Sequence, residues 1–127
     1  MYTTFKRELA HQVKEVAETL CADLNIEVKF ATGSSVQSKV ENVRRGKVDI
    51  LIGSVGGLSK MFSGKLFFSD FVDTIVLDEI DTMVDDSFKG VTGFLLAQLR
   101  KKFEQQFIFA GATFPTTLST SLGTKGD

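Results

Sequence analysis

Two adjacent carboxylates follow an apolar run in the middle of the chain. Asp78 and Glu79 come directly after residues 71–77, which have the composition of a buried β-strand. In parallel α/β sheets, ligands gather outside the carboxyl ends of the strands. Here one carboxylate can hold Mg²⁺, usually through water, and the next can polarise an attacking water, as nucleoside triphosphate hydrolysis requires. A solvated acidic turn would give the same pattern, so the neighbouring segments must decide.

Strands and helices alternate along the chain and would position this pair. Apolar and β-branched runs predict strands over residues 26–30, 48–52, 71–77 and 106–110. Helical spacing predicts helices over residues 7–24, 36–45 and 88–103, a short helix ending at Phe62, a turn or short helix over 81–87 and a helix opened by Pro115. The pattern is typical of an α/β fold with a parallel sheet and flanking helices.

Apolar spacing on the first helix predicts which of its faces meets the core. We expect the buried stripe to consist of Leu9, Val13, Val16, Leu20 and Leu24. Cys21 lies beside this stripe and is expected in the core, whereas His11 lies off it and is expected at the surface.

Length and composition limit the number of domains, the kinds of partner and the compartment that we expect. The 127 residues suit one domain, and 15 Lys and Arg against 16 Asp and Glu give a net charge of -1, so any nucleic-acid contact must be local. A single cysteine cannot form an internal disulfide and favours a reducing compartment. With no apolar run long enough for a membrane span and no signal pattern, we expect a soluble intracellular protein without membrane contact. Nucleus, cytoplasm and mitochondrion stay open.

Five segments in chain order resemble the consecutive motifs of the DEAD-box ATP-dependent RNA helicases. They are residues 5–10 (Phe-Lys-Arg-Glu-Leu-Ala), 32–33 (Thr-Gly), 49–58 (Asp-Ile-Leu-Ile-Gly-Ser-Val-Gly-Gly-Leu), 76–81 (Val-Leu-Asp-Glu-Ile-Asp) and 111–113 (Gly-Ala-Thr). The likeness covers nearly the whole chain. It implies an incomplete RecA-like (P-loop NTPase) fold, with residues 1–127 as the C-terminal portion of helicase domain 1.

The resemblance implies ATP and Mg²⁺ as cofactors and gives the acidic motif its roles. Asp78 would anchor Mg²⁺ through water, and Glu79 would orient or deprotonate the attacking water. Asp81 would couple nucleotide state to RNA affinity through the Gly-Ala-Thr segment, where Thr113 retains a hydroxyl.

RNA is the partner that the resemblance implies. Arg7, Gly33, Ser54 and Gly56 would line a track for its phosphate backbone, because small residues allow close approach while amides, hydroxyls and a cation bind phosphate oxygens. Such contacts are independent of base sequence.

The chain departs from the family pattern at several positions. Ile80 replaces an alanine, Gly57 replaces an arginine that would contact phosphate, and Gly111 replaces a serine that would bond Asp81. Phe5 and Lys6 replace the Pro-Thr of the first motif. These changes leave open a degenerate helicase-like module that binds RNA or protein without ATPase activity. A DNA helicase of the same superfamily is a third reading, which residues 7–10 disfavour.

A phosphate loop of the form G-x-x-x-x-G-K-[ST] does not occur in the sequence. In the family this loop and its strand precede the first motif found here, and a second RecA-like domain follows. We therefore expect that the chain is a fragment, that alone it hydrolyses no ATP, and that it is marginally stable because its sheet would lack a strand.

Overall fold

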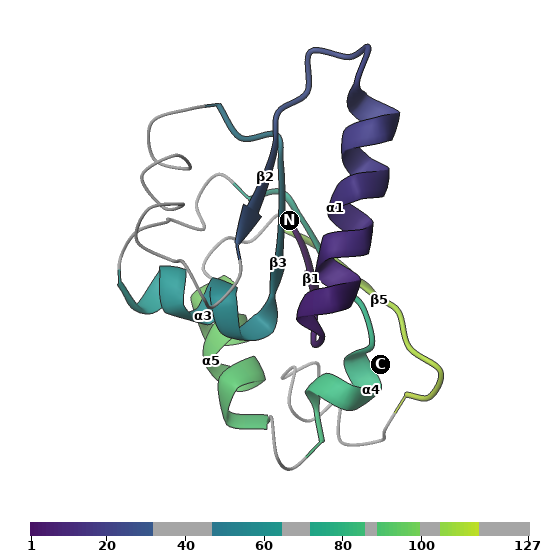
Figure 1. The fold of residues 1–127 in the computed structure, drawn as a ribbon. Helices are drawn as coiled ribbons and strands as arrows, with labels where there is room; N and C mark the ends of the chain where they lie inside the picture. Colours follow the sequence, from purple (N-terminus) through teal and green to yellow (C-terminus); the bar gives the residue numbers. More distant parts are fainter. Residues whose placement is uncertain (32–46, 65–71, 86–88, 100–104, 115–127) are drawn as a thin grey trace.

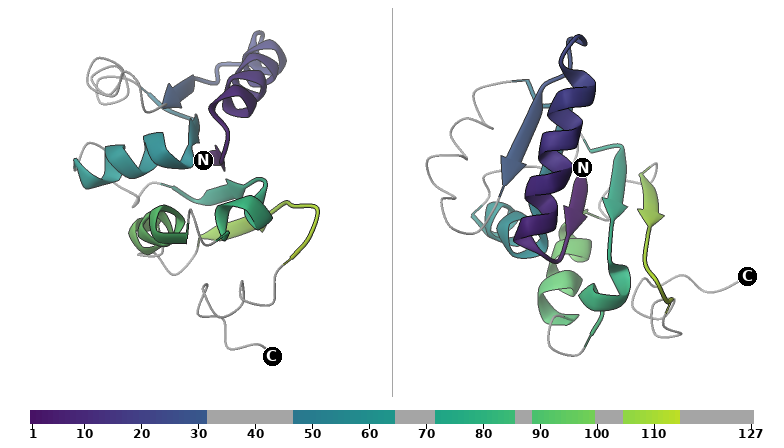
Figure 2. Two further views of the ribbon diagram at one scale, coloured as in Figure 1. Left: turned by 60° about the horizontal axis from the view of Figure 1, so that its bottom comes forward. Right: turned by 45° about the vertical axis from the view of Figure 1, so that its right-hand side comes forward.

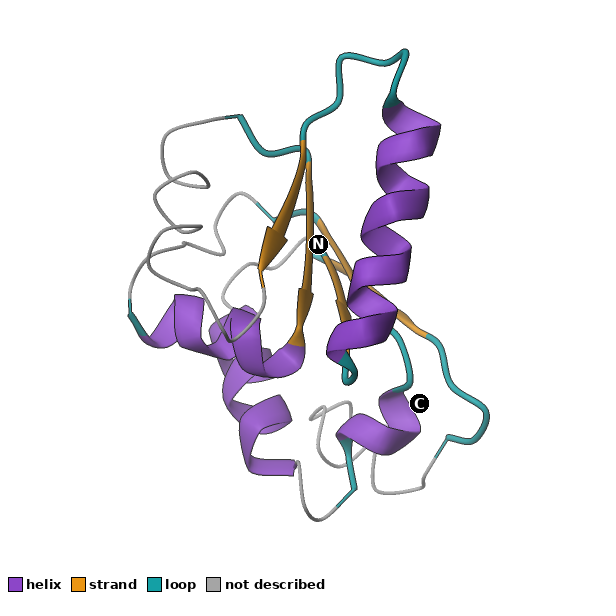
Figure 3. Ribbon diagram, in the orientation of Figure 1, coloured by secondary structure: helices purple, strands orange, loops and turns teal. Residues whose placement is uncertain are grey.

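The structure is a computed structural model that describes residues 1–31, 47–64, 72–85, 89–99 and 105–114. Its centre is a five-stranded sheet, flanked by helices (Figures 1 and 3). The strands are β1 (Tyr2–Thr4), β2 (Val28–Ala31), β3 (Ile50–Ser54), β4 (Thr74–Leu77) and β5 (Gln106–Phe109). The described helices are α1 (Arg7–Cys21), α3 (Val55–Ser63), α4 (Ile80–Met83) and α5 (Lys89–Leu99).

Every strand pair in the sheet is parallel, in the order β2-β3-β1-β4-β5. The predicted α/β class is confirmed. The predicted elements that fall on described residues are present, with bounds shifted by a few residues. The helix expected over 36–45 and the one opened by Pro115 lie outside the described residues.

The central strand, β1, was not predicted from the sequence. Tyr2 pairs in register with Ile52 of β3 and Val76 of β4, and Thr4 pairs with Ser54. Three residues, two of them threonines, are too short for an alternation of apolar and polar side chains to be recognised. β1 nevertheless joins the two halves of the sheet.

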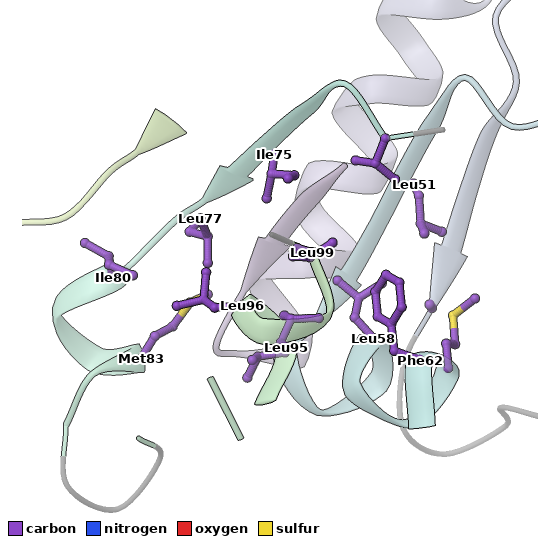
Figure 4. Packing of buried hydrophobic residues seen from close by; sticks show 14 residues of the cluster. Leu51, Leu58, Phe62, Ile75, Leu77, Ile80, Met83, Leu95, Leu96 and Leu99 are labelled. Carbon is purple, nitrogen blue, oxygen red and sulfur yellow. The ribbon is translucent and has the colours of Figure 1, made fainter. Parts of the chain in front are cut away.

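The larger core lies between the sheet and the helices α3 and α5. Figure 2 shows these two helices on one side of the sheet and α1 on the other. Apolar residues at helical spacing point inward from α3 (Leu58 and Phe62) and from α5 (Leu95 and Leu99) (Figure 4), and Met61 of α3 belongs to the same cluster. They pack on Leu51, Ile75 and Leu77, which alternate with residues on the opposite face of their strands.

On the other face, α1 packs through a narrower stripe than the sequence predicted. Ala10 is fully buried and packs with Phe30 and Ile52, and Val13 and Ala17 join this cluster. The prediction was wrong for three members of the expected stripe: Val16, Leu20 and Leu24 are 58%, 72% and 56% exposed. Small residues at positions 10 and 17 bring the helix close to the sheet, and this turns the larger side chains onto its flank.

The packing of α1 also determines how far two of its other residues are exposed. Cys21 was expected in the core, but it is only half-buried and belongs to neither of the two described core clusters. His11 is exposed, as expected, and its ring centroid lies 4.5 Å from that of Phe30. No helix in the described part of the chain is long and apolar enough to cross a membrane.

Candidate functional site

The carboxyl ends of the parallel strands bring several polar side chains to one edge of the sheet. Thr4 and Ser54 are register partners at the ends of β1 and β3, and Thr3 pairs with Leu77 immediately before Asp78. The amide N–H of Asp78 donates to the carbonyl of Thr3 at 2.9 Å, which extends the pairing by one residue. Asp78 therefore lies level with Thr4 and Ser54 at the sheet edge where α/β proteins bind ligands.

Both carboxylate oxygens of Asp78 accept hydrogen bonds. The hydroxyl of Tyr2 donates to Oδ2, and the amide N–H of Glu79 donates to Oδ1 at 2.9 Å. Asp78 is half-buried, so these bonds fix a carboxylate that solvent still reaches. This is the arrangement expected of a carboxylate that acts on a ligand in a set orientation.

The carboxylate of Glu79 is held by the neighbouring strand. The hydroxyl of Thr4, which is fully buried, donates to Oε2 of Glu79 at 3.3 Å. The two carboxylates are thus each contacted by a residue of β1, and those two residues lie two positions apart on the same face of the strand. Sequence reasoning missed Tyr2 and Thr4, because β1 itself was not recognised.

Glu79 has a backbone conformation that side chains seldom adopt. Its φ of 55° and ψ of 43° lie in the left-handed region, and it is the one non-glycine residue with positive φ in the described ranges. Such a residue costs on the order of 1–2 kcal/mol and persists where the surroundings hold it in place. Here the carbonyl of Glu79 accepts from the amides of Thr82 and Met83, so that α4 starts directly after the acidic pair. The strain concentrates at the residue with the candidate chemistry.

Burial and the neighbouring carboxylates change the pKa of Tyr2. Removal from solvent, followed by the hydrogen bond to Asp78 and the nearby negative charges of Asp78 and Glu79, raises the pKa of the Tyr2 phenol well above its ordinary value. A phenol is already protonated at neutral pH, and this shift keeps the hydroxyl a donor to Asp78 in more alkaline solution as well.

Asp81 lies beside the segment that follows β5. The amide of Ile80 donates to the carbonyl of Ala110 at 3.0 Å, and the amide of Ala110 donates to Leu77 at 2.9 Å. A β-carbon built at Gly111 would lie 3.0 Å from Oδ1 of Asp81, so the two residues are in contact range. Thr113 is exposed, and among the described residues no hydrogen bond joins it to Asp81. The structure brings Asp81 to Gly111 without showing the bond to Thr113.

Two helix N-termini lie at the same edge as the carboxylates. Arg7 is exposed at the first residue of α1, and Ser54 is the N-cap of α3, where its hydroxyl oxygen accepts from the amide of Gly57 at 3.2 Å. Gly56 lies in the first turn of α3, and a β-carbon there would meet nothing within 4 Å. Gly33 lies outside the described residues. The structure thus places Arg7, Ser54 and Gly56 together at this edge.

The family model for DEAD/DEAH box helicases matches residues 1–121, nearly the whole chain. The chain belongs to this helicase family. A probable ATP-dependent RNA helicase of Mus musculus, DDX28, is 34% identical over 129 residues, covering 91% of this chain and 24% of the mouse protein. The ATP-dependent RNA helicase RhlB of Vibrio vulnificus (strain CMCP6) is 32% identical over 107 residues, covering 84% of this chain and 25% of that protein. The chain spans about a quarter of the length of these relatives.

Solved helicase structures share the fold. The yeast DEAD-box splicing factor Prp28 superposes with a TM-score of 0.82 at 20% identity, covering 99% of this chain and 30% of that one. A hypothetical ATP-dependent RNA helicase from Sulfolobus tokodaii gives 0.80 at 22% identity, covering 99% and 38%. The predicted RecA-like architecture is confirmed.

The structure shows what surrounds three of the positions at which the chain departs from the DEAD-box pattern. Ile80 is fully buried in the larger core, so the bulkier side chain in place of alanine adds apolar contact. Gly57 is buried, and its amide caps α3 through Ser54, so the helix start is kept although the arginine is absent. The glycine at 111 leaves no side chain between its backbone and Asp81.

The donor set of this DEAD-box segment fits magnesium. Within the described ranges, no cluster of three or more His, Cys, Asp or Glu side chains could hold a metal by itself. Mg²⁺ needs no such cage, because it keeps several waters and takes one or two carboxylates together with substrate phosphates. Asp78 would supply such a carboxylate, and Glu79 places a second carboxylate beside it.

Proposed function

We propose that this chain is the C-terminal portion of the first domain of an ATP-dependent RNA helicase, which couples Mg-ATP hydrolysis to binding and remodelling of RNA. The observation that carries the proposal is the acidic pair at the end of β4. Asp78 accepts two hydrogen bonds, and Glu79 is held in the left-handed region by its neighbours. Fixed carboxylates at the ligand-binding edge of a parallel sheet suit phosphoryl transfer, where positioning and electrostatics supply most of the catalysis.

In this proposal the two carboxylates have separate roles. Asp78 would hold Mg²⁺ through a bound water, and Glu79 would orient the attacking water or take its proton. Magnesium, when bound, neutralises charge that develops on the phosphates. The remaining phosphate contacts come from protein beyond this segment, since the relatives are about four times longer.

Coupling between nucleotide and RNA is proposed to run through Asp81. The backbone bonds that join Ile80, Ala110 and Leu77 tie the start of α4 to the end of β5. A shift of the acidic motif on ATP binding is then transmitted to the Gly-Ala-Thr segment, where Thr113 supplies the hydroxyl that replaces the family serine. Gly111 provides no such hydroxyl, and the coupling through this chain depends on Thr113.

The proposed RNA contacts use the N-termini of α1 and α3. A helix N-terminus presents free amides and a positive dipole end to phosphate. Arg7 adds a cation, while Ser54 and Gly56 add a hydroxyl and room for close approach; Gly33 is proposed to extend this track. The recognised feature is the sugar-phosphate backbone rather than the bases.

The RNA part of the proposal is tested by Arg7→Ala in the complete protein. We expect weaker binding of single-stranded RNA and a shallower dependence of affinity on salt, because one phosphate contact and its counterion release are lost. Lys14→Ala is the matched control, since Lys14 lies two turns further along α1 and pairs with Glu18. Equal RNA affinities for the two variants would show that Arg7 does not contact the RNA phosphate backbone.

A second candidate is a helicase-like module that binds RNA without turnover. Gly57 and Gly111 favour it, because each lacks a side chain that the family uses for phosphate or for Asp81. ATP hydrolysis by the complete protein, with and without RNA, separates the two. RNA-stimulated phosphate release supports the enzyme, and RNA binding with no release supports the module.

A further inference from the structure

Tyr2 of β1 lies outside the five motifs, yet its hydroxyl contacts Asp78 of the acidic pair. Tyr2 lies on the α1 side of the sheet, where its ring packs against the cluster of Ala10, Phe30 and Ile52. Its register partner on β4 is Val76, two residues before Asp78, so the phenol extends along the strand direction to Oδ2. An aromatic side chain has two rotatable angles, and packing of the ring fixes both. The hydroxyl is therefore a rigid donor.

Thr4 repeats this arrangement one step further along β1. Side chains two residues apart on a strand lie on the same face, and Thr4 reaches Glu79 as Tyr2 reaches Asp78. Thr4 is fully buried, so its hydroxyl has little choice of other acceptors. One strand thus supports both carboxylates through alternate residues.

The two hydrogen bonds to the Asp78 carboxylate leave room for it to accept further hydrogen bonds. An ionised carboxylate has about four acceptor sites on its two oxygens. Tyr2 and the amide of Glu79 occupy one site on each oxygen. The remaining sites can accept from metal-bound water, so the tyrosine orients the carboxylate without blocking it.

We propose that Tyr2 is a positioning residue for the acidic motif, which holds the Asp78 carboxylate in the orientation that receives hydrated Mg²⁺, with Thr4 acting in the same way on Glu79. The inference rests on the proposed role of Asp78. Residues that hold a metal-binding carboxylate set its orientation, and their loss commonly costs at least about tenfold in metal affinity or activity. A purely structural tyrosine would affect folding stability and leave metal affinity unchanged.

The contact itself is tested in the metal-free 127-residue chain. Tyr2 is the only tyrosine and there is no tryptophan, so tyrosine emission reports on this side chain alone. A phenol that donates to a carboxylate emits weakly, and Asp78→Asn is expected to raise the emission. Asp23→Asn, an exposed position with the same change of charge, is expected to leave it unchanged, with circular dichroism confirming the fold of each variant. Equal emission from wild type and Asp78→Asn would overturn the contact.

The positioning role is tested by Tyr2→Phe in the complete helicase, which keeps the ring and removes only the hydroxyl. We expect the dissociation constant for Mn²⁺ in the presence of ADP, measured by electron paramagnetic resonance, to rise about tenfold. The Mg²⁺ concentration for half-maximal ATP hydrolysis should rise in parallel, with a smaller change in kcat at saturating Mg²⁺. Unchanged metal affinity with lowered thermal stability would overturn the proposal and leave a structural tyrosine.

A double-mutant cycle separates this inference from the proposed function. If Tyr2 acts through Asp78, Tyr2→Phe changes Mn²⁺ affinity in the wild type and has no further effect in Asp78→Asn. If Asp78→Asn by itself leaves Mn²⁺ affinity unchanged, the proposed metal site fails. If Asp78→Asn weakens the metal and Tyr2→Phe does not, only the positioning role fails. Thr4→Val, with Thr4→Ser expected to restore the wild-type kcat, gives the matching test for Glu79.

Discussion

At the scale of single residues, tight local geometry supports the functional edge. The backbone of Glu79 lies in the left-handed region. At position 53 of β3, directly before Ser54, the surroundings leave room only for glycine. A β-carbon at Gly53 would lie 2.5 Å from the carbonyl oxygen of Ala31 and 2.9 Å from Cγ of Leu58. Gly53 thus allows β2, β3 and α3 to approach one another directly beneath the N-cap of α3.

Substitution of Gly53 therefore has a definite expected result. Gly53→Ala should lower the free energy of unfolding by about 1–3 kcal/mol, because the methyl group forces backbone and core side chains apart. Gly56→Ala is the matched control: it lies three residues on in a helix with open space around it and should raise stability by about 0.5–1 kcal/mol. Chemical denaturation measures both. A neutral Gly53→Ala would show that the site is looser than the contacts indicate.

Residue identities at the site could be read from the sequence to different degrees. Asp78 and Glu79 were identifiable because a strand ending in two carboxylates is visible in the local pattern. Tyr2 and Thr4 were not, because their role depends on β1 lying beside β4, where Tyr2 pairs with Val76, a residue 74 positions later in the chain. That pairing is a property of the whole sheet, and no local pattern contains it.

At the scale of elements, the start of β3 is tied to the start of the neighbouring strand β2 through the carboxylate of Asp49. Oδ2 of Asp49 accepts from the amide of Glu27 at 2.8 Å and lies 3.2 Å from Nζ of Lys47. The hydrogen bond from Glu27, assisted by Lys47, lowers the pKa of Asp49 below its ordinary value. The ionised form is thus favoured by folding.

This pKa shift predicts a dependence of stability on pH. Since the folded-state pKa is lowered, the contribution is fully present above the ordinary carboxyl pKa of 3.8 and is lost as the pH falls through the lowered value. Asp49→Ala should therefore lose less stability than the wild type on acidification below about pH 4. Asp23→Ala should follow the wild type. Parallel thermal unfolding series for the three proteins provide the check, and identical acid profiles would contradict the assigned contact.

The elements also show where periodicity fails as a guide. Helical spacing correctly predicted α1, yet it selected Val16 and Leu20 for the core instead of Ala10 and Ala17. The spacing identifies an apolar side of the helix, but the line of closest approach depends on which small residues the sheet can accept. The α3 and α5 faces were simpler, because both sides of their contact are large and apolar.

At the scale of the whole molecule, the two faces of the sheet are unequally covered. Among the described helices, α3, α4 and α5 contribute to the larger cluster on one face, and α1 alone contributes to the smaller cluster on the other. On that second face Ile108 of the edge strand β5 is 43% exposed, and the flank of α1 exposes Leu20 at 72%. Exposed apolar surface beside an edge strand lowers stability and favours association.

We therefore expect the isolated 127-residue chain to be marginally stable. Its free energy of unfolding should fall below about 5 kcal/mol, the lower end of the range for native domains, with a broad thermal transition. Circular dichroism with sedimentation velocity measures stability and oligomeric state together. A sharp, cooperative transition of a monomer would show that the described core is sufficient by itself.

The central claim is that the acidic pair at the end of β4 activates water for ATP hydrolysis. Its most direct test is RNA-stimulated phosphate release by the complete protein carrying Glu79→Gln, with Glu15→Gln on the exposed side of α1 as the control for a lost carboxylate. The account predicts a fall in kcat of at least about 100-fold, because a general base is removed, with little change in KM for ATP and none for the control variant. Turnover by Glu79→Gln at the wild-type rate would contradict it.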